Sequence, residues 1–482
     1  MFGPYQMLMD FGIMSMLLIF AHLLRSKLKI LQYIYMPSSL IAGFIALFCG
    51  WQFLDILPFA VKENGTPYIS SYPYLLVVLL FAGLFLGKDE NAVKVPFKKM
   101  VKDIGDTFFY NLGSEVWQFG AALLFGLFVL APLFPDLNQG FALMLPAGFV
   151  GGHGYATAIG KTMQNYGWEE ALTVGYTSAT VGLLSGVIGG MILINIATRK
   201  GWTRLVKDVA SLPQSMLTGF VPENERVSMG KETVNPIALD PFTWHFALTM
   251  AAFAIGYFAY DLTKTLMPGK YEIPMMCLSM LAGVLIQKIL DVARLGEYVD
   301  KHVMNRIGSW VTDYLVAFGV ASIQVSVVIK YAVPMLLLFS FGIFLCVTFA
   351  LLLGRRVFHN FWFERSIFVY GWNTGVVAIG VTLLRVVDPE FKTKTLEDYG
   401  FAYVFISFFE IAIVSILPSL VANGIILQPA LLLVGTCIAC IVLTKVTNGW
   451  RADIPPCALR EGEAEVLLAF NSTNSIHTNR EI

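Results

Sequence analysis

Apolar stretches long enough to cross a lipid bilayer recur along almost the entire chain, and this recurrence constrains the fold more than any other feature. A helix of about 20 apolar residues spans the roughly 30 Å hydrocarbon core of a membrane. Only 14% of the 482 residues are charged and 56% are hydrophobic, whereas soluble domains carry about 25% charged residues. Lipid must therefore cover much of the surface, and the zero net charge argues against nucleic acid as a partner. The sequence predicts an all-α integral membrane protein.

Eleven spanning helices are expected. They lie near 5–24, 34–54, 73–87, 111–134, 171–198, 242–262, 272–290, 311–329, 332–353, 400–424 and 427–447. Two further stretches, 141–165 and 364–388, are moderately apolar, rich in Gly and carry polar residues in their middle. Because irregular backbone at membrane depth is tolerated only inside protein or beside a water-filled cavity, we interpret both as re-entrant or broken-helix hairpins.

The distribution of basic residues predicts the orientation. With the N-terminus outside and both hairpins returning to their own side, only five of the 33 Lys and Arg residues lie outside. These five are Lys62, Lys161, Lys264, Lys270 and Lys330. The positive-inside rule strongly favours this arrangement, and it also favours hairpins that return.

The order of the segments is typical of an inverted-topology repeat. Residues 1–198 hold five spans and begin outside, whereas 241–424 hold five and begin inside, each with a hairpin before its fifth span. Residues 199–240 are expected to form a cytoplasmic linker, 425–447 an extra transmembrane helix, and 448–482 a polar, soluble or loose tail.

The two hairpins also resemble each other in sequence. Five residues of the first hairpin recur as identical residues 220 positions later: Gly151, Ala158, Ile159, Gly160 and Thr162. Transporters with inverted repeats bind their substrate near the midplane, where the ends of broken helices face it. Free N–H groups at helix N-termini suit carboxylates. The predicted substrate-binding residues are Gly151, Gly152, His153, Gly154, Tyr155, Thr157, Trp372, Asn373, Thr374 and Gly375.

Few ionisable residues remain inside the predicted spans. A carboxylate at membrane depth is costly, so Glu410 is a candidate for binding a cation or a proton. Thr177 and Thr180 lie one turn apart and are candidate ligands for a hard cation. Gln118 shares one helix face with Asn111 and Glu115, at spacings of i, i+4 and i+7. Glu115 could also sit near the membrane interface.

Two basic residues flank the hairpin cores, Lys161 and Arg385. Either could balance an anionic substrate, and either could equally anchor the chain at the interface. The six His residues show no metal-ligand spacing, so no metal beyond a transported sodium ion and no other cofactor is expected. An enzyme would need a paired nucleophile and base, or a metal cluster, at membrane depth. We therefore expect a transporter and not an enzyme.

The glycine pattern resembles that of the bacterial sodium/glutamate symporter family. The similar residues are the run Gly151–Gly154, Tyr166-Gly167, the glycines Gly182, Gly186, Gly189 and Gly190, and the segment Leu383–Pro389. Glu410 falls where better-known members carry an Asp. The resemblance implies two inverted five-helix halves, a homodimer, a moving transport domain and sodium-coupled import of an anionic amino acid across the bacterial cytoplasmic membrane.

One departure from the family pattern concerns the substrate. Glutamate carriers have a Gly-His-Cys-Gly type second hairpin, whereas this chain has Gly371-Trp372-Asn373-Thr374. Since this change is expected to face the ligand, a proton- or sodium-coupled carrier of di- or hydroxycarboxylates with the same fold remains the alternative. A gated channel is a further alternative, although ion-coupled repeats with hairpins favour a carrier.

Overall fold

The computed structural model describes residues 4–33, 36–60, 68–87, 97–205, 218–223, 226, 228–266, 275–388, 391–451, 454–460 and 463–464. The regular elements in these ranges are helices, apart from a single bridge residue at Asp300. Nine of the described helices are long and apolar enough to cross a membrane. The prediction of an all-helical, multi-pass membrane protein is therefore confirmed.

The helices divide between the two parts of the chain. In the first part of the chain they are α1 (Pro4–Lys27), α2 (Lys29–Tyr33), α3 (Ser38–Cys49), α4 (Tyr72–Gly83), α5 (Phe97–Phe125), α6 (Ala131–Leu133), α7 (Met144–Phe149), α8 (Gly152–Asn165) and α9 (Ala171–Arg199). In the second part they are α11 (Pro241–Leu266), α12 (Met275–Val292), α13 (Lys301–Ala321), α14 (Val325–Lys330), α15 (Ala332–Thr348), α16 (Gly354–Val357), α17 (Trp362–Val387), α18 (Thr395–Ala422) and α19 (Leu427–Asn448).

The helix predicted at 311–329 begins and ends earlier, as α13. Asp300 caps its first turn by accepting a hydrogen bond from the Val303 amide at 3.0 Å. The polar first turns lower the hydropathy, which displaced the prediction toward the more apolar residues that follow. After Ala321 the chain turns, and the Gln52 side chain hydrogen-bonds to the Ile323 carbonyl at 2.6 Å and to the Val325 amide at 2.8 Å.

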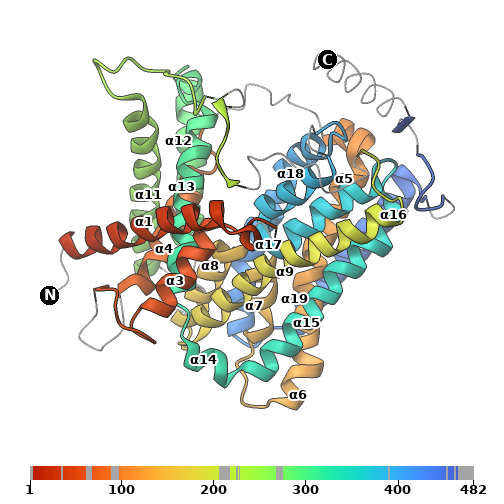
Figure 1. Ribbon diagram of the computed structural model, residues 1–482, viewed down its shortest axis with the longest axis horizontal. Helices are drawn as coiled ribbons and strands as arrows, with labels where there is room; N and C mark the ends of the chain where they lie inside the picture. Colours follow the sequence, from red (N-terminus) through yellow and green to blue (C-terminus); the bar gives the residue numbers. More distant parts are fainter. Residues whose placement is uncertain are drawn as a thin grey trace.

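The helices form two groups that lie side by side (Figure 1). The flanking group consists of α1, α3, α4, α11, α12 and α13, and the hairpin group consists of α5, α7, α8, α9, α15, α17, α18 and α19. The groups meet mainly where α4 and α13 contact α8, and where α13 contacts α9. Each group combines helices from both parts of the chain, as expected if the two parts interlock.

Both predicted hairpin stretches contain a break. In the first hairpin (141–165), α7 ends at Phe149 and α8 begins at Gly152, whose φ is +58°. The second hairpin is α17, which is non-helical at Gly375 and Val376. A Cβ added to Gly371 would lie 2.7 Å from the Gly380 Cα, although nine residues of straight helix span about 13.5 Å. The two arms of α17 therefore fold back on each other.

The two breaks do not follow the 220-residue offset. The first lies at Val150–Gly152 and the second at Gly375–Val376, which is about one helical turn later than the sequence match implies. As a result, Trp372 and Asn373 lie on the first arm of α17, whereas Gly152 and His153 begin the second arm of their hairpin. Positions that match in sequence thus face different surroundings.

Part of the polar tail predicted to be loose is packed against the hairpin group. Glu463 is fully buried and pairs with Arg204 at 2.9 Å. Trp362, at the start of α17, donates its indole N–H to the Pro456 carbonyl at 3.0 Å. The prediction of a loose tail is therefore wrong for 454–460 and 463–464. Residues 465–482 of the tail and 206–217 of the linker lie outside the described residues.

Candidate functional site

A cavity of about 300 Å³ lies where the tips of both hairpins face the flanking group. Its walls come from α4, α8, α9, α13, α17 and α18. Seven of the residues selected from the sequence line it: Gly151, Gly152, His153, Gly154, Tyr155, Trp372 and Glu410. A concave site of this size, with few polar groups among apolar walls, is typical of a small-molecule binding site.

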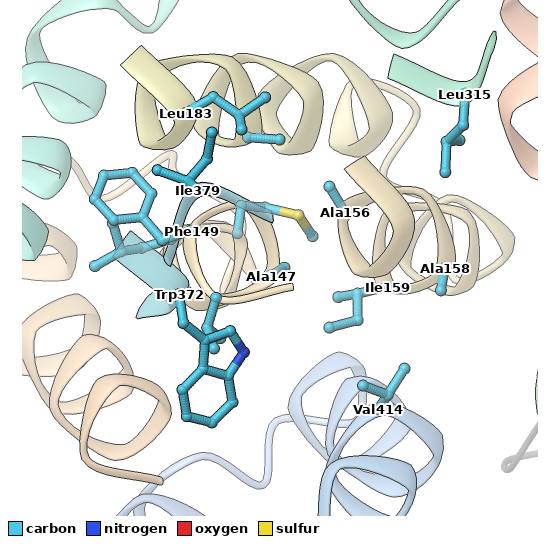
Figure 2. Close-up of a cluster of buried hydrophobic side chains, with 14 of the residues drawn as sticks. Ala147, Phe149, Ala156, Ala158, Ile159, Leu183, Leu315, Trp372, Ile379 and Val414 are labelled. Carbon is cyan, nitrogen blue, oxygen red and sulfur yellow. The ribbon is translucent and has the colours of Figure 1, made fainter. Parts of the chain in front are cut away.

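The hairpin tips touch each other at the cavity. Gly152 lies so close to the side chain of Val376 that an added Cβ would overlap with it. Its positive φ also favours glycine, because a side chain there would strain the backbone. Behind the tips, Phe149, Leu183 and Ile379 pack together where α7, α9 and α17 meet (Figure 2). This apolar packing fixes the two tips relative to α9.

Two helix N-termini face the cavity. One is the start of α8 at Gly152, and the other is the start of the second arm of α17, where Val376, Val377 and Ala378 line the cavity. Each N-terminus presents free N–H groups and about half a positive charge. No Lys or Arg lines the cavity in the described part of the chain. An anion would therefore be held mainly by backbone N–H groups.

His153 lines this first cavity, which we call the inner cavity, and it adjoins a second, larger one, which we call the outer cavity. The outer cavity measures about 780 Å³ and is lined by Tyr176, Lys161 and Glu170, among other mainly polar residues. The His153 and Tyr176 rings stack with centroids 6.2 Å apart. The imidazole is 3% exposed, and its Nε2 lies 3.3 Å from the Thr180 hydroxyl. His153 and Tyr176 thus form a thin partition between the two cavities.

An ion pair lies at the wall of the outer cavity. Lys330 of α14 lies 2.6 Å from the Glu170 carboxylate. The hydrogen bond from Lys330 lowers the pKa of Glu170, although partial burial opposes this shift. Lys161 also lines this cavity and donates to Gln164 at 2.9 Å. Positive charge is thus available in the outer cavity.

Glu410 is the charged residue at the wall of the inner cavity. Its Oε2 accepts hydrogen bonds from the hydroxyls of Tyr155 and Tyr403, both at 2.8 Å. Tyr155 belongs to α8, so the carboxylate connects α18 to the tip of the first hairpin. Its side chain is 4% exposed, which places an acidic group in a largely apolar setting.

The other residues selected as substrate ligands lie behind the tips. Thr157 donates to the His153 carbonyl at 2.5 Å, and Thr374 donates to the Tyr370 carbonyl at 2.7 Å. Gly375 packs against Leu183 and Ile379. None of these residues, nor Asn373, is among those that line the inner cavity. These residues bond or pack within the hairpins, on the side of the tips that does not face the inner cavity.

The candidate cation ligands fall in three places. Thr180 is paired with His153, whereas the Thr177 hydroxyl donates within its own helix to the Thr173 carbonyl at 2.7 Å. Gln118 of α5 donates to the Asn373 carbonyl at 2.9 Å. The structure therefore does not bring Thr177, Thr180, Gln118 and Glu410 together into one coordination sphere.

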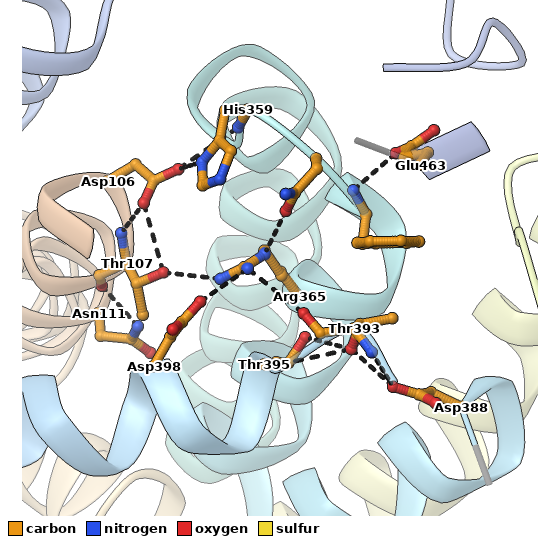
Figure 3. A network of polar contacts seen from close by, with 12 residues as sticks. Asp106, Thr107, Asn111, His359, Arg365, Asp388, Thr393, Thr395, Asp398 and Glu463 are labelled. Carbon is orange, nitrogen blue, oxygen red and sulfur yellow. Dashed lines mark hydrogen bonds and ion pairs between the residues drawn. The ribbon is translucent and has the colours of Figure 1, made fainter. Parts of the chain in front are cut away.

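Neither basic candidate lines the inner cavity. Lys161 lines the outer cavity, and the Arg385 guanidinium lies 5.2 Å above the Phe391 ring. Arg365, which was not selected, is instead buried at the base of α17 and binds Asp398 at 2.7 Å (Figure 3). In the same network His359 pairs with the buried Asp106. This network ties α17 to α5 and α18 and has the character of a structural support.

Glu115 is not among the predicted ligands, although the structure buries its carboxylate beside the second hairpin. Its side chain is fully buried, and neither carboxylate oxygen has a hydrogen-bond partner among the described residues. The signal in the sequence was its spacing with Asn111 and Gln118. That spacing cannot distinguish a buried polar face from one near the membrane surface.

Comparison with known proteins gives one family match. Residues 136–364 match the family model described as sodium/glutamate symporter, which is slightly less than half of the chain. The match covers the first hairpin and α9, and it ends before the tip of the second hairpin and Glu410. A comparison with curated proteins gives no match. The resemblance indicated by the glycine pattern is thereby confirmed for residues 136–364, which are similar to the sodium/glutamate symporter family of transporters.

Proposed function

We propose that this protein is a secondary transporter that couples sodium entry to uptake of glutamate, or a related small anionic amino acid, across the bacterial cytoplasmic membrane. The observation that carries the proposal is a single cavity shared by two helix N-termini and one buried carboxylate. The match to a family of sodium/glutamate symporters supports it. Fold alone would not, because one fold supports many functions.

The two helix N-termini would bind the anionic part of the substrate. Free N–H groups of α8 and of the second arm of α17 point toward the cavity without a basic side chain beside them. This arrangement suits a carboxylate, because backbone N–H groups are fixed in place and bring no mobile charge. Glycine at positions 151, 152 and 154 lets the ligand approach the backbone closely.

The carboxylate of Glu410 would make binding of the anion depend on a cation. An anionic substrate and Glu410 in one cavity repel each other, and a cation nearby removes this repulsion. Each ligand then increases the affinity for the other by the same factor, as thermodynamic linkage requires. Such reciprocal coupling is what a symporter needs.

Alternating access would come from movement of the hairpin group against the flanking group. The two groups meet at a limited set of helices, and cavities lie on both sides of the His153–Tyr176 partition. An inverted repeat also fits the packing. The second helix of the first part, α3, contacts the third helix of the second part, α13, and α12 contacts α4 in the same way.

We further propose that the transporter works as a homodimer.

Uptake of labelled glutamate into proteoliposomes tests this function. We expect uptake to be accelerated by an inward sodium gradient and not by an equal potassium gradient. A panel of unlabelled amino acids, dicarboxylates and hydroxycarboxylates identifies the preferred substrate. Uptake of the preferred substrate driven by a proton gradient alone would contradict sodium coupling.

Replacing His153 with Leu is expected to abolish uptake while the protein still inserts and folds. Leucine fills a similar volume but cannot bind Thr180 or present a ring nitrogen to the cavity. His302→Leu serves as the matched control, because His302 is exposed in the first turn of α13. Uptake at the wild-type rate by the His153→Leu protein would remove His153 from the site.

A further inference from the structure

A cluster of buried polar side chains lies behind the first arm of α17. Asn111, Glu115 and Gln118 project from one face of α5, and Asn373 lies on the facing arm of α17. Gln118 donates to the Asn373 carbonyl at 2.9 Å, so these two helices are in direct contact here. All four side chains are at most 4% exposed.

The unpaired atoms of these side chains are nearly all acceptors. Five oxygens have no hydrogen-bond partner among the described residues: Asn111 Oδ1, both carboxylate oxygens of Glu115, Gln118 Oε1 and Asn373 Oδ1. Buried polar groups in proteins are almost always satisfied, so five unmatched acceptors on neighbouring positions require an explanation. The missing partner must accept electron pairs or donate protons.

The ionisable groups around Glu115 do not supply this partner. Glu410 and the hydroxyls of Tyr155, Tyr399 and Tyr403 interact with it electrostatically, and none of them is cationic. Tyr155 and Tyr403 already donate to Glu410, which leaves the Tyr399 hydroxyl as an unmatched donor. One phenol cannot satisfy five oxygens.

A bare cation satisfies these oxygens better than a proton. A proton on Glu115 would create one hydrogen bond and match one further oxygen, leaving the others unmatched. A hard cation prefers oxygen ligands from carboxylates and amide carbonyls, which are the groups present. One carboxylate and three neutral amides balance a single positive charge, which favours a monovalent ion over a divalent one.

We propose that Glu115, Gln118, Asn111 and Asn373 form a sodium-binding site behind the second hairpin. The inference rests on the proposed function, because it assigns one coupling ion of that transporter to a specific place. It also gives Asn373 a new role, since this side chain would bind the ion and not the substrate. The neighbouring Trp372 lines the inner cavity.

The location connects ion binding to the substrate cavity. Asn373 lies two residues before the break at Gly375, and Val376 on the other side of the break lines the cavity. An ion that holds the Asn373 side chain against α5 would fix the first arm and therefore the N-terminus of the second arm. The anion would then meet a preformed site.

Equilibrium binding of ²²Na⁺ to the full-length protein in lipid nanodiscs, without substrate, tests the site. We expect the wild-type protein to bind ²²Na⁺ saturably, with choline keeping the ionic strength constant. Glu115→Gln is expected to bind it at least about tenfold more weakly, or with one site fewer per chain. Gln118→Leu is expected to weaken binding as well and serves if the Glu115 variant does not fold.

The control is Glu397→Gln, the same chemical change at an exposed position of α18, which is expected to bind ²²Na⁺ like the wild type. Unaltered binding by folded Glu115→Gln, or by folded Gln118→Leu where the first variant fails, would overturn the site. If that occurs while sodium still drives uptake by the wild type, only this inference fails. If sodium drives no uptake, the proposed function fails, whereas loss of ²²Na⁺ binding in Glu115→Gln would still support the site.

Discussion

Glu410→Gln is expected to decrease sodium-stimulated uptake by roughly 5- to 150-fold, the usual range of coupling between two binding sites. The amide keeps the shape of the side chain and can still accept a hydrogen bond from Tyr155 or Tyr403. It lacks the negative charge that would attract a cation into the inner cavity. Uptake that remains should depend less on sodium, because the charge that links the two ligands is gone.

The measurement is the initial rate of uptake at increasing sodium concentration, with and without saturating substrate. Glu397→Gln again provides the matched control, since Glu397 is exposed in the first turn of the same helix. A sodium dependence of Glu410→Gln that matches the wild type would assign Glu410 a structural role, in which it only anchors the two tyrosines.

The sequence was most informative where it departed from uniform apolarity. Glycine with polar residues inside an apolar stretch predicted both hairpins, and a lone carboxylate in an apolar stretch singled out Glu410. These signals have a physical basis, because irregular backbone and charge at membrane depth are costly and persist only for a reason. Seven of the selected residues accordingly line one cavity.

The direction of individual side chains could not be predicted. Asn373 was expected to face the substrate, yet it does not line the inner cavity, because the break in α17 comes after it at Gly375. Its backbone carbonyl instead accepts a hydrogen bond from Gln118 of α5. Which residue in a glycine-rich segment breaks the helix depends on what packs against it. Here Gly371 and Gly380 permit the close contact of the two arms, and this tertiary contact sets the position of the turn.

The pairing and burial of polar residues that lie far apart in the sequence could not be predicted either. Arg204 lies in a polar linker and Glu463 in a polar tail, so composition indicated solvent exposure for both. Each is buried because the other provides its partner, at a separation of 259 positions along the chain. A pairing of this kind leaves no local periodicity to detect.

The contact between Arg204 and the tail is unusually complete. Its guanidinium donates to Glu463 at 2.9 Å and to the carbonyl oxygens of Gly201, Pro456, Cys457 and Ala458. These bonds use the full donor capacity of an arginine. Glu463 in turn accepts from the amides of Phe361 and Arg460 at 2.7 and 2.9 Å. The tail thereby connects the end of α9 to the start of α17.

Arg204→Met is therefore expected to destabilise the folded protein by about 3–5 kcal/mol, because it leaves the buried Glu463 carboxylate without its charged partner. The midpoint of thermal unfolding of the purified protein measures this loss. The matched control is Lys330→Met, which removes the cation of the exposed Lys330–Glu170 pair and should change the midpoint little. Adding Glu463→Gln to Arg204→Met should recover part of the loss, since it removes the stranded charge. Equal midpoints for Arg204→Met and the wild type would mean that the tail packs without supporting the base of the second hairpin.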